Sequence, residues 1–153
     1  MKTPQRLVEE YGGWMALVFA FIVSCFTNPD KYHYSELIHG FPAIGLGIFG
    51  FMLTFIAIIL QSSNKTIDFM KSQTELFKCF INYNRRVVYT SALLTLYAYL
   101  VSSFKIPFDS VICGYSVHQF LKVFAISSFW GLLAKLGVDT FYFIKVFYIL
   151  LRK

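Results

Sequence analysis

The sequence predicts an all-α fold: an integral membrane four-helix bundle that occupies residues 1–153 as a single transmembrane domain. Hydrophobic residues make up 57% of the chain and charged residues 14%, whereas soluble domains carry about 25% charged residues. Four apolar runs approach or reach the roughly 17 to 25 residues that a membrane helix needs. These runs do not alternate between apolar and polar positions, as the strands of a membrane barrel would. We therefore expect no separate soluble domain.

The four helices are expected at residues 11–26, 41–60, 87–104 and 117–151. The first ends at the turn-forming sequence TNPD and the second at the polar sequence QSSNK. The third ends before Pro107, which cannot continue a hydrogen-bonded helix. The fourth is so long that it should cross the membrane and protrude. Glu9, Glu10 and the lack of an A-x-A cleavage site indicate that the first run is a retained helix and not a signal peptide.

Basic residues gather in three parts of the chain, and this distribution predicts the orientation in the membrane. The connection between the second and third helices carries Lys65, Lys71, Lys78, Arg85 and Arg86. The two ends of the chain add Lys2, Arg6, Lys145, Arg152 and Lys153. The other two connections carry only Lys31 and Lys105. Both termini and the basic connection are therefore expected in the cytoplasm. This bias also explains the net charge of +6, so we expect no direct binding of nucleic acid.

Small residues recur at helical spacing in the second helix, where they form a stripe: Ala43, Gly47, Gly50, Thr54 and Ala57. In lipid, small residues let helix backbones approach closely, and this drives association. Similar stripes occur in the other helices: Ser91, Thr95, Ala98 and Ser102; Gly13, Ala16 and Ala20; Ser127, Gly131 and Ala134. We expect a tight bundle whose bulky Phe, Leu and Ile side chains face lipid. The stripe of the second helix either packs within the chain, joins subunits of a homo-oligomer, or lines a pore.

The connection between the second and third helices is amphipathic. Its apolar residues repeat at helical spacing: Ile67, Met70, Thr74, Phe77 and Ile81. Charges of alternating sign follow another face: Lys65, Asp68, Lys71, Glu75 and Lys78. This pattern predicts a cytosolic helix or helical hairpin. The segment either lies in the lipid headgroup layer or extends the second and third helices into the cytosol as a platform for a partner. Lys65, Lys71, Lys78, Arg85 and Arg86 are the candidates for contact with that partner or with lipid.

The fourth helix holds the ionisable residues nearest to the hydrocarbon. Lys135 and Asp139 are four residues apart and share one helix face, while Lys122 lies near the outer end. A charge at the bilayer centre costs about 3 kcal/mol on insertion scales. A long side chain can avoid part of this cost by extending to the interface. Lys135 therefore either extends away or forms an intramembrane pair with Asp139.

The sequence carries little catalytic or metal-binding chemistry. His33, His39 and His118 fall on the predicted outer side, and their spacing matches no metal motif, so we expect no metal and no cofactor. Cys79 should be reduced in the cytosol, and a bridge between Cys25 and Cys113 would need Cys25 at the outer rim. No phosphate-binding loop, nucleophile elbow or H-E-x-x-H motif is present, and we do not expect an enzyme.

A resemblance to a known class of proteins follows from three features of residues 40–104. A glycine-bearing second helix ends FMLTFIAIILQSS, a short basic connection follows, and the third helix begins NRRVVYTSALL. These features resemble small four-helix membrane proteins of bacterial and prophage defence, such as the membrane component of the Kiwa anti-phage system and the lambda RexB protein. The resemblance implies an oligomeric sensor or effector in the bacterial inner membrane that acts with a soluble cytosolic partner. It assigns no functional residue, because no diagnostic motif is available to match.

Two other classes stay open. The chain is similar in size and topology to the immunity proteins that protect cells against pore-forming colicins, and it shares their basic C-terminal character in FIKVFYILLRK. That similarity implies a protein that binds the membrane domain of a toxin. A small ion channel subunit is the third alternative. It would need polar side chains along a path, and the sequence offers few beyond Lys135 and Asp139.

Overall fold

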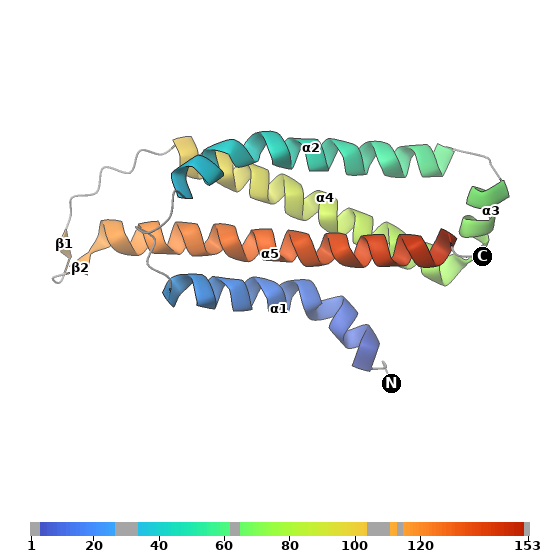
Figure 1. Cartoon of the computed structure of the whole chain (residues 1–153), viewed down its shortest axis with the longest axis horizontal. Helices are drawn as coiled ribbons and strands as arrows, with labels where there is room; N and C mark the ends of the chain where they lie inside the picture. The colour runs from blue at the N-terminus through green and yellow to red at the C-terminus, as the bar shows by residue number, and fades with distance from the viewer. Residues whose placement is uncertain (1–3, 27–33, 62–64, 104–110, 113–114, 152–153) are drawn as a thin grey trace.

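The computed structural model describes residues 4–26, 34–61, 65–103, 111–112 and 115–151. The described residues form helices α1 (Pro4–Phe26), α2 (Tyr34–Gln61), α3 (Lys65–Ser72), α4 (Thr74–Ser103) and α5 (Val117–Leu151). Two short antiparallel strands, β1 (Val111–Ile112) and β2 (Tyr115–Ser116), precede α5 (Figure 1). The prediction of an all-α fold is therefore confirmed, apart from this pair of strands.

The four long helices correspond to the four that the sequence predicts, but three begin earlier than expected, α1 at Pro4 among them. α2 begins at Tyr34 and includes Pro42, while α4 begins at Thr74. The amphipathic connection is thus helical: α3 occupies its first part, and α4 runs through the rest without interruption. α3 meets α4 at Gln73, whose amide donates to the Met70 carbonyl over 3.2 Å. Pro107, expected to end the third helix, lies outside the described residues.

The long helices pack in the order α1, α5, α4, α2, which differs from their order in the chain (Figure 1). Successive long helices run in opposite directions, so α1 begins and α5 ends at the same end of the molecule (Figure 1). α2 and α5 meet mainly through aromatic rings. Phe55 lies 5.8 Å from Phe143 and 5.3 Å from Phe147, measured between ring centroids. α2, α4 and α5 therefore surround an aromatic core, and α1 packs on the outside of α5.

Phenylalanines fill much of this core. Phe80 is fully buried and stacks on Phe143, with 5.1 Å between ring centroids. The expectation that bulky Phe, Leu and Ile side chains lie on the outer faces of the bundle therefore holds for many of them, such as Phe51, but not for the rings of this core. Large rings are needed inside because α2 and α5 do not approach closely enough for small residues to fill the space.

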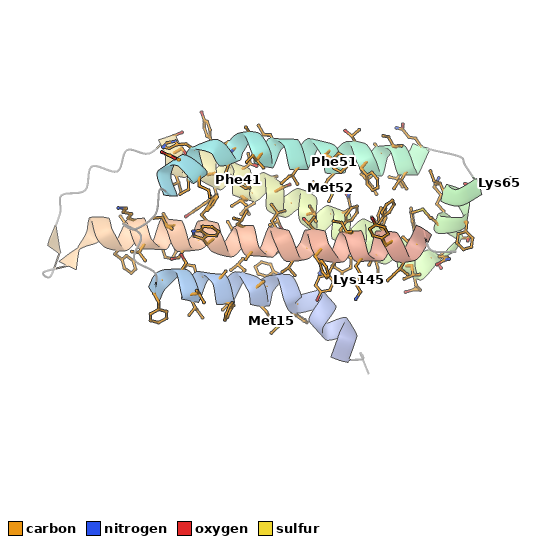
Figure 2. All side chains as sticks on the ribbon, in the orientation of Figure 1. Met15, Phe41, Phe51, Met52, Lys65 and Lys145 are labelled. Carbon is orange, nitrogen blue, oxygen red and sulfur yellow. The ribbon has the colours of Figure 1, made fainter. Side chains whose placement is uncertain are left out.

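Large apolar side chains also cover the outside of all four long helices. Met15 on α1 and Phe51 on α2 are 65% and 67% exposed, whereas Met52, the next residue along α2, is only 4% exposed (Figure 2). Two helical stretches are long and apolar enough to cross a membrane, Glu36–Gln61 and Phe120–Leu150, and α1 contributes a shorter apolar stretch, Tyr11–Phe26. Only 17% of the most apolar part of α2 is buried, so α2 does not resemble the core helix of a soluble protein.

Small residues bring the helices together at three of the four predicted stripes. Ser91, Thr95 and Ala98 of α4 are buried. A Cβ on Gly13 of α1 would lie 2.5 Å from Asp139, and one on Gly131 of α5 would lie 3.0 Å from the Leu17 carbonyl oxygen. Side chains at these two glycines would force α1 away from α5.

Most of the stripe of α2 does not pack against the described part of the chain. Ala43, Gly47, Gly50 and Thr54 are exposed, and a Cβ on Gly47 or Gly50 would meet no atom within 4 Å. Of the three alternatives, packing within the chain is therefore not seen at these four residues, while Ala57, the fifth residue of the stripe, is half-buried. α2 instead turns a different face toward α4 and the core, formed by Phe41, Gly45, Met52 and Ile59. At Gly45 the backbone of α2 lies close to α4, since a Cβ there would overlap Thr95 Oγ1.

Gly45 and Gly47 provide a matched test of this packing. We expect Gly45→Leu to reduce the free energy of unfolding by about 1 to 3 kcal/mol or more, because the added side chain collides with α4. Gly47→Leu should leave the stability of the single chain almost unchanged. Thermal unfolding of the purified variants in mild detergent measures both effects. Equal losses for the two variants would contradict the observed orientation of α2.

Candidate functional site

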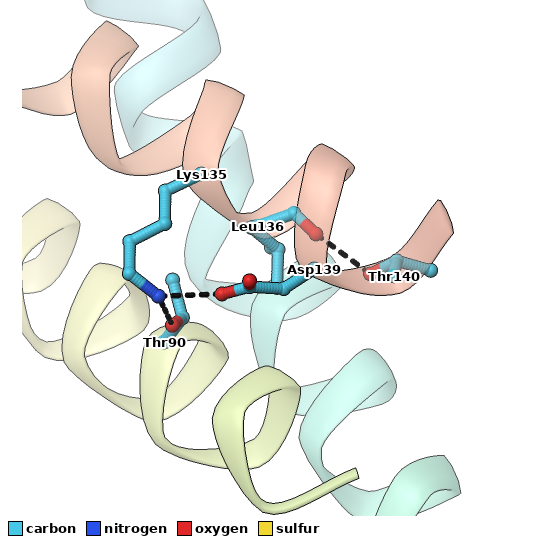
Figure 3. Close-up of polar contacts among 5 residues, drawn as sticks. All are labelled: Thr90, Lys135, Leu136, Asp139 and Thr140. Carbon is cyan, nitrogen blue, oxygen red and sulfur yellow. Dashed lines mark hydrogen bonds and ion pairs between the residues drawn. The ribbon is translucent and has the colours of Figure 1, made fainter. Parts of the chain in front are cut away.

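A buried ion pair on α5 is the main polar feature of the described helices. Lys135 Nζ donates to Asp139 Oδ2 over 2.5 Å and to Thr90 Oγ1 of α4 over 3.0 Å (Figure 3). Lys135 is 7% exposed and Asp139 is 2% exposed. The pair therefore forms as one of the two sequence alternatives predicts, and the Lys135 side chain does not extend toward an end of α5.

The pair lies close to the middle of the apolar stretch Phe120–Leu150. Isolated charges are very costly to bury, and a pair stays ionised only where each charge finds a close partner. Here the carboxylate and the Thr90 hydroxyl each take one hydrogen bond from the ammonium group. The contact to Thr90 also links α5 to α4, so the pair fixes how these two helices meet.

α1 closes the other side of the pair. The Lys135 ammonium lies 5.2 Å from the centroid of the Trp14 ring, a distance at which a cation is attracted to the ring face. The adjacent Gly13 lets the backbone of α1 approach Asp139. The site thus joins α1, α4 and α5. Sequence reasoning missed Thr90 and Trp14, although the small stripe that contains Gly13 indicated where α1 would be close-packed.

Two basic side chains and two tyrosine rings lie next to one another about one helix turn from the ion pair, toward the start of α4 and the end of α5. Arg86 lies 5.4 Å from the centroid of the Tyr83 ring, and Lys145 lies 5.9 Å from that of Tyr142. The two tyrosine rings stack between α4 and α5, with their centroids 5.8 Å apart. Arg86 also lines a cavity of about 270 Å³ that extends to Lys135 and Asp139. Arg86 is therefore part of the same site as the ion pair.

The five basic residues predicted to contact a partner or lipid do not share one surface. Lys65, Lys78 and Arg85 are exposed, and Lys78 forms a long ion pair of 3.8 Å with Glu75. Lys71 instead donates to the Leu60 carbonyl over 3.2 Å and ties α3 to the end of α2. Arg86 is half-buried and turns toward Tyr83.

The apolar face of the connection is covered by the protein itself. Met70 of α3 and Phe80 of α4 are 2% and 0% exposed. Because α3 packs on α4 and α5, this face is not left open for the headgroup layer. Of the alternative in which the segment extends the second and third helices, the structure shows only the part for the third: α4 is continuous from Thr74, whereas α2 ends at Gln61 and α3 is a separate helix.

The histidines and cysteines do not form a recognisable site in the described residues. His39 is exposed, and neither His33 nor the side chain of His118 is described. Within the described ranges, no three His, Cys, Asp or Glu side chains are arranged to hold a metal ion. Cys25 is a free thiol that donates to Ser127 Oγ over 3.4 Å, and Cys113 lies outside the described residues.

Comparison with known proteins gives no match for this chain, whether to protein-family models, curated proteins or solved structures. The resemblance to membrane proteins of anti-phage defence therefore rests on sequence pattern alone. The similarity to colicin immunity proteins rests on the same kind of evidence.

Removing one partner of the ion pair should be costly, and removing both should not. We expect Lys135→Met or Asp139→Leu alone to lower the free energy of unfolding by about 3 to 5 kcal/mol, because a buried charge loses its counter-charge. The double variant should recover most of this loss. Unfolding of the purified proteins in detergent measures all three, and Glu75→Gln at the exposed pair is a control that should change little. A double variant as unstable as the sum of the single variants would contradict a coupled pair.

Proposed function

We propose that this chain is a multi-pass protein of the bacterial inner membrane, and that it acts as an oligomeric sensor or effector in anti-phage defence with a soluble cytosolic partner. In this arrangement all four long helices cross the membrane and both termini lie in the cytoplasm. α3 and the first turns of α4 form the cytosolic platform. The defence role comes from the sequence resemblance, and the membrane arrangement is supported by features of the fold.

Three observations support the arrangement in the membrane. The outer faces of all four long helices carry exposed large apolar side chains, which lipid would cover. α1 begins and α5 ends at the same end of the molecule (Figure 1). The basic residues Lys65, Lys78 and Arg85 are exposed on the segments that lead into and through the start of α4. A single orientation places these residues and both termini on the cytoplasmic side.

Reporter fusions test this orientation. A reporter joined to Lys153 or inserted at Gln73 should be active only as a cytoplasmic reporter, and one inserted near Ser35 only as an external reporter. The reason is that basic segments are retained in the cytoplasm. Paired cytoplasmic and periplasmic reporters at each site provide the measurement. An external signal at Gln73 would overturn the arrangement.

The proposal that the protein transmits a signal is based on the length and contacts of α5. It is one helix of 35 residues, and its central ion pair is bonded to Thr90 of α4. A shift or tilt of the outer part of α5 can therefore be passed to α4 through this contact. α4 continues without a break into the cytosolic platform. The pathway from outside to inside thus follows α5, the ion pair and α4.

The exposed stripe of α2 supports association with another helix in the membrane. The described residues leave Gly47 and Gly50 open, and close backbone approach over small residues is a main source of helix association in lipid. In the defence proposal the other helix belongs to a second copy of the chain. The same stripe favours the second candidate, an immunity protein, in which the other helix belongs to the membrane domain of a toxin.

Charge reversal on the platform separates the two candidates. Lys65→Glu combined with Lys78→Glu should abolish recruitment of a cytosolic partner and protection against phage, because both side chains are exposed on the proposed docking face. Membrane insertion should be unchanged. Pull-down from membranes and phage plating measure these effects.

The control for the platform variant is His39→Glu, which also adds negative charge but lies near the start of α2, at the end of that helix far from the platform. It should leave protection against phage intact. If the platform variant also protects fully, the platform is not the output surface and the defence proposal fails. Protection of cells against a pore-forming toxin, with no effect on phage, would establish the immunity function instead.

A further inference from the structure

We propose that the cavity between α1 and α4 binds a membrane amphiphile with an uncharged hydroxyl head, and that this hydroxyl donates a hydrogen bond to Asp139 Oδ1. Diacylglycerols and quinols are two sources of such a head. Such binding rests on the membrane arrangement proposed above, and it needs neither the defence role nor a free charge on Arg86. α5 forms the floor of the cavity, and α1 and α4 form its two sides.

Only one of the two carboxylate oxygens of Asp139 has a hydrogen-bond donor in the described part of the chain. Oδ2 accepts the hydrogen bond from Lys135 Nζ (Figure 3). Oδ1 lies on the side of α1, where a Cβ on Gly13 would be 2.5 Å from it. Asp139 is 2% exposed and lines the cavity. Because a buried carboxylate oxygen without a donor is costly, Oδ1 is a strong acceptor for a ligand that can donate.

The charges around the cavity favour a neutral ligand. Lys135 and Asp139 neutralise each other, and the Lys135 ammonium also donates to the Thr90 hydroxyl. Arg86 already has interactions of its own, the contact with the Tyr83 ring among them, so it supplies no free charge. An ion beside the pair would therefore bring a buried charge without a partner, which costs far more than a buried hydroxyl. A hydroxyl can donate to Oδ1 without changing the net charge.

The rest of the cavity suits a hydrocarbon chain. Leu17 of α1, Leu93 of α4 and Leu132 of α5 line it, together with the rings of Trp14 and Tyr89. Trp14, Tyr89 and Leu93 are each more than half exposed, so the cavity opens on the outer surface of the bundle. In the proposed arrangement lipid covers this surface. An amphiphile can therefore enter from the side without leaving the membrane.

The cavity is too small for a whole lipid. Its volume is about 270 Å³, just below the range of roughly 300 to 1,000 Å³ typical of small-molecule pockets. It holds a head and the first part of one chain. The chain gains little by leaving the surrounding lipid, because lipid tails are as apolar as leucine. The hydrogen bond to the carboxylate, which is stronger than one between neutral groups, therefore decides which amphiphile binds.

Two kinds of variant separate the head from the chain. The double variant Lys135→Met, Asp139→Leu removes the acceptor and both charges together, and it is the change expected to keep most of the stability. Leu93 lines the cavity and Leu96 does not, and both are more than half exposed. Leu93→Trp therefore fills the cavity without disturbing the core, and Leu96→Trp adds the same ring elsewhere on α4.

The experiment counts amphiphiles bound to the full-length protein by native mass spectrometry. Protein is extracted from the membrane fraction into an alkyl amine oxide detergent, which has no hydroxyl group to compete. The probes are dioctanoylglycerol with its acetate ester, and a decyl-substituted benzoquinol, kept reduced, with its dimethyl ether. Only the first member of each pair can donate a hydrogen bond.

We expect the wild type to bind one molecule of a hydroxyl probe about tenfold or more tightly than its capped form, because the capped form cannot donate to Oδ1. A preference within one pair only would identify the source of the head. The double variant should lose the preference. Leu93→Trp should bind neither form, and Leu96→Trp should behave as the wild type.

Several results would overturn this assignment. Equal binding within both pairs, or no binding of any probe, would show that the hydroxyl is not recognised. A preference that persists in the double variant would place the acceptor elsewhere, and unchanged binding by Leu93→Trp would place the ligand outside the cavity. If the double variant does not fold, the two tryptophan variants still test the cavity. A wrong membrane arrangement would be seen separately, because the protein would not be recovered from the membrane fraction.

Discussion

The burial of two opposite charges near the middle of α5 is the constraint on which the arrangement of the helices depends. Burying an ion pair costs free energy of desolvation, so the surrounding helices must supply compensating contacts. Thr90 of α4 provides a hydrogen bond, Trp14 of α1 provides a ring face, and Gly13 lets α1 come close. We infer that the pair contributes more to the choice of one helix arrangement than to overall stability.

Two kinds of packing hold the remaining helices around this centre. Where backbones come close, as α1 does on α5 at Gly131, small residues form the contact. Where α2 and α5 stay apart, the Phe55, Phe143 and Phe147 rings fill the space. Small residues and large rings thus serve different distances between helices. The stripe of α2 belongs to neither group among the described residues, where Gly47 and Gly50 stay open.

The proposed cytosolic platform, formed by α3 and the first turns of α4, shares chain elements with the rest of the bundle. α4 runs continuously through both, and Phe80 anchors its first turns in the aromatic core by stacking on Phe143. Lys71 ties α3 to the end of α2 through the Leu60 carbonyl. The exposed basic side chains of α3 and of the start of α4 are therefore anchored to the same core as the long helices.

The sequence alone determined the all-α class, the extent of α5 and the helical periodicity of the connection, because all of these follow from local patterns of apolar residues. It also showed that Lys135 and Asp139 share a helix face. Only the tertiary structure decided that they form a pair, because that depends on Thr90 and Trp14 from distant helices. It likewise decided that α2 packs through Gly45 and leaves Gly47 open. Periodicity defines the faces of a helix, but the neighbouring helices determine which face is buried.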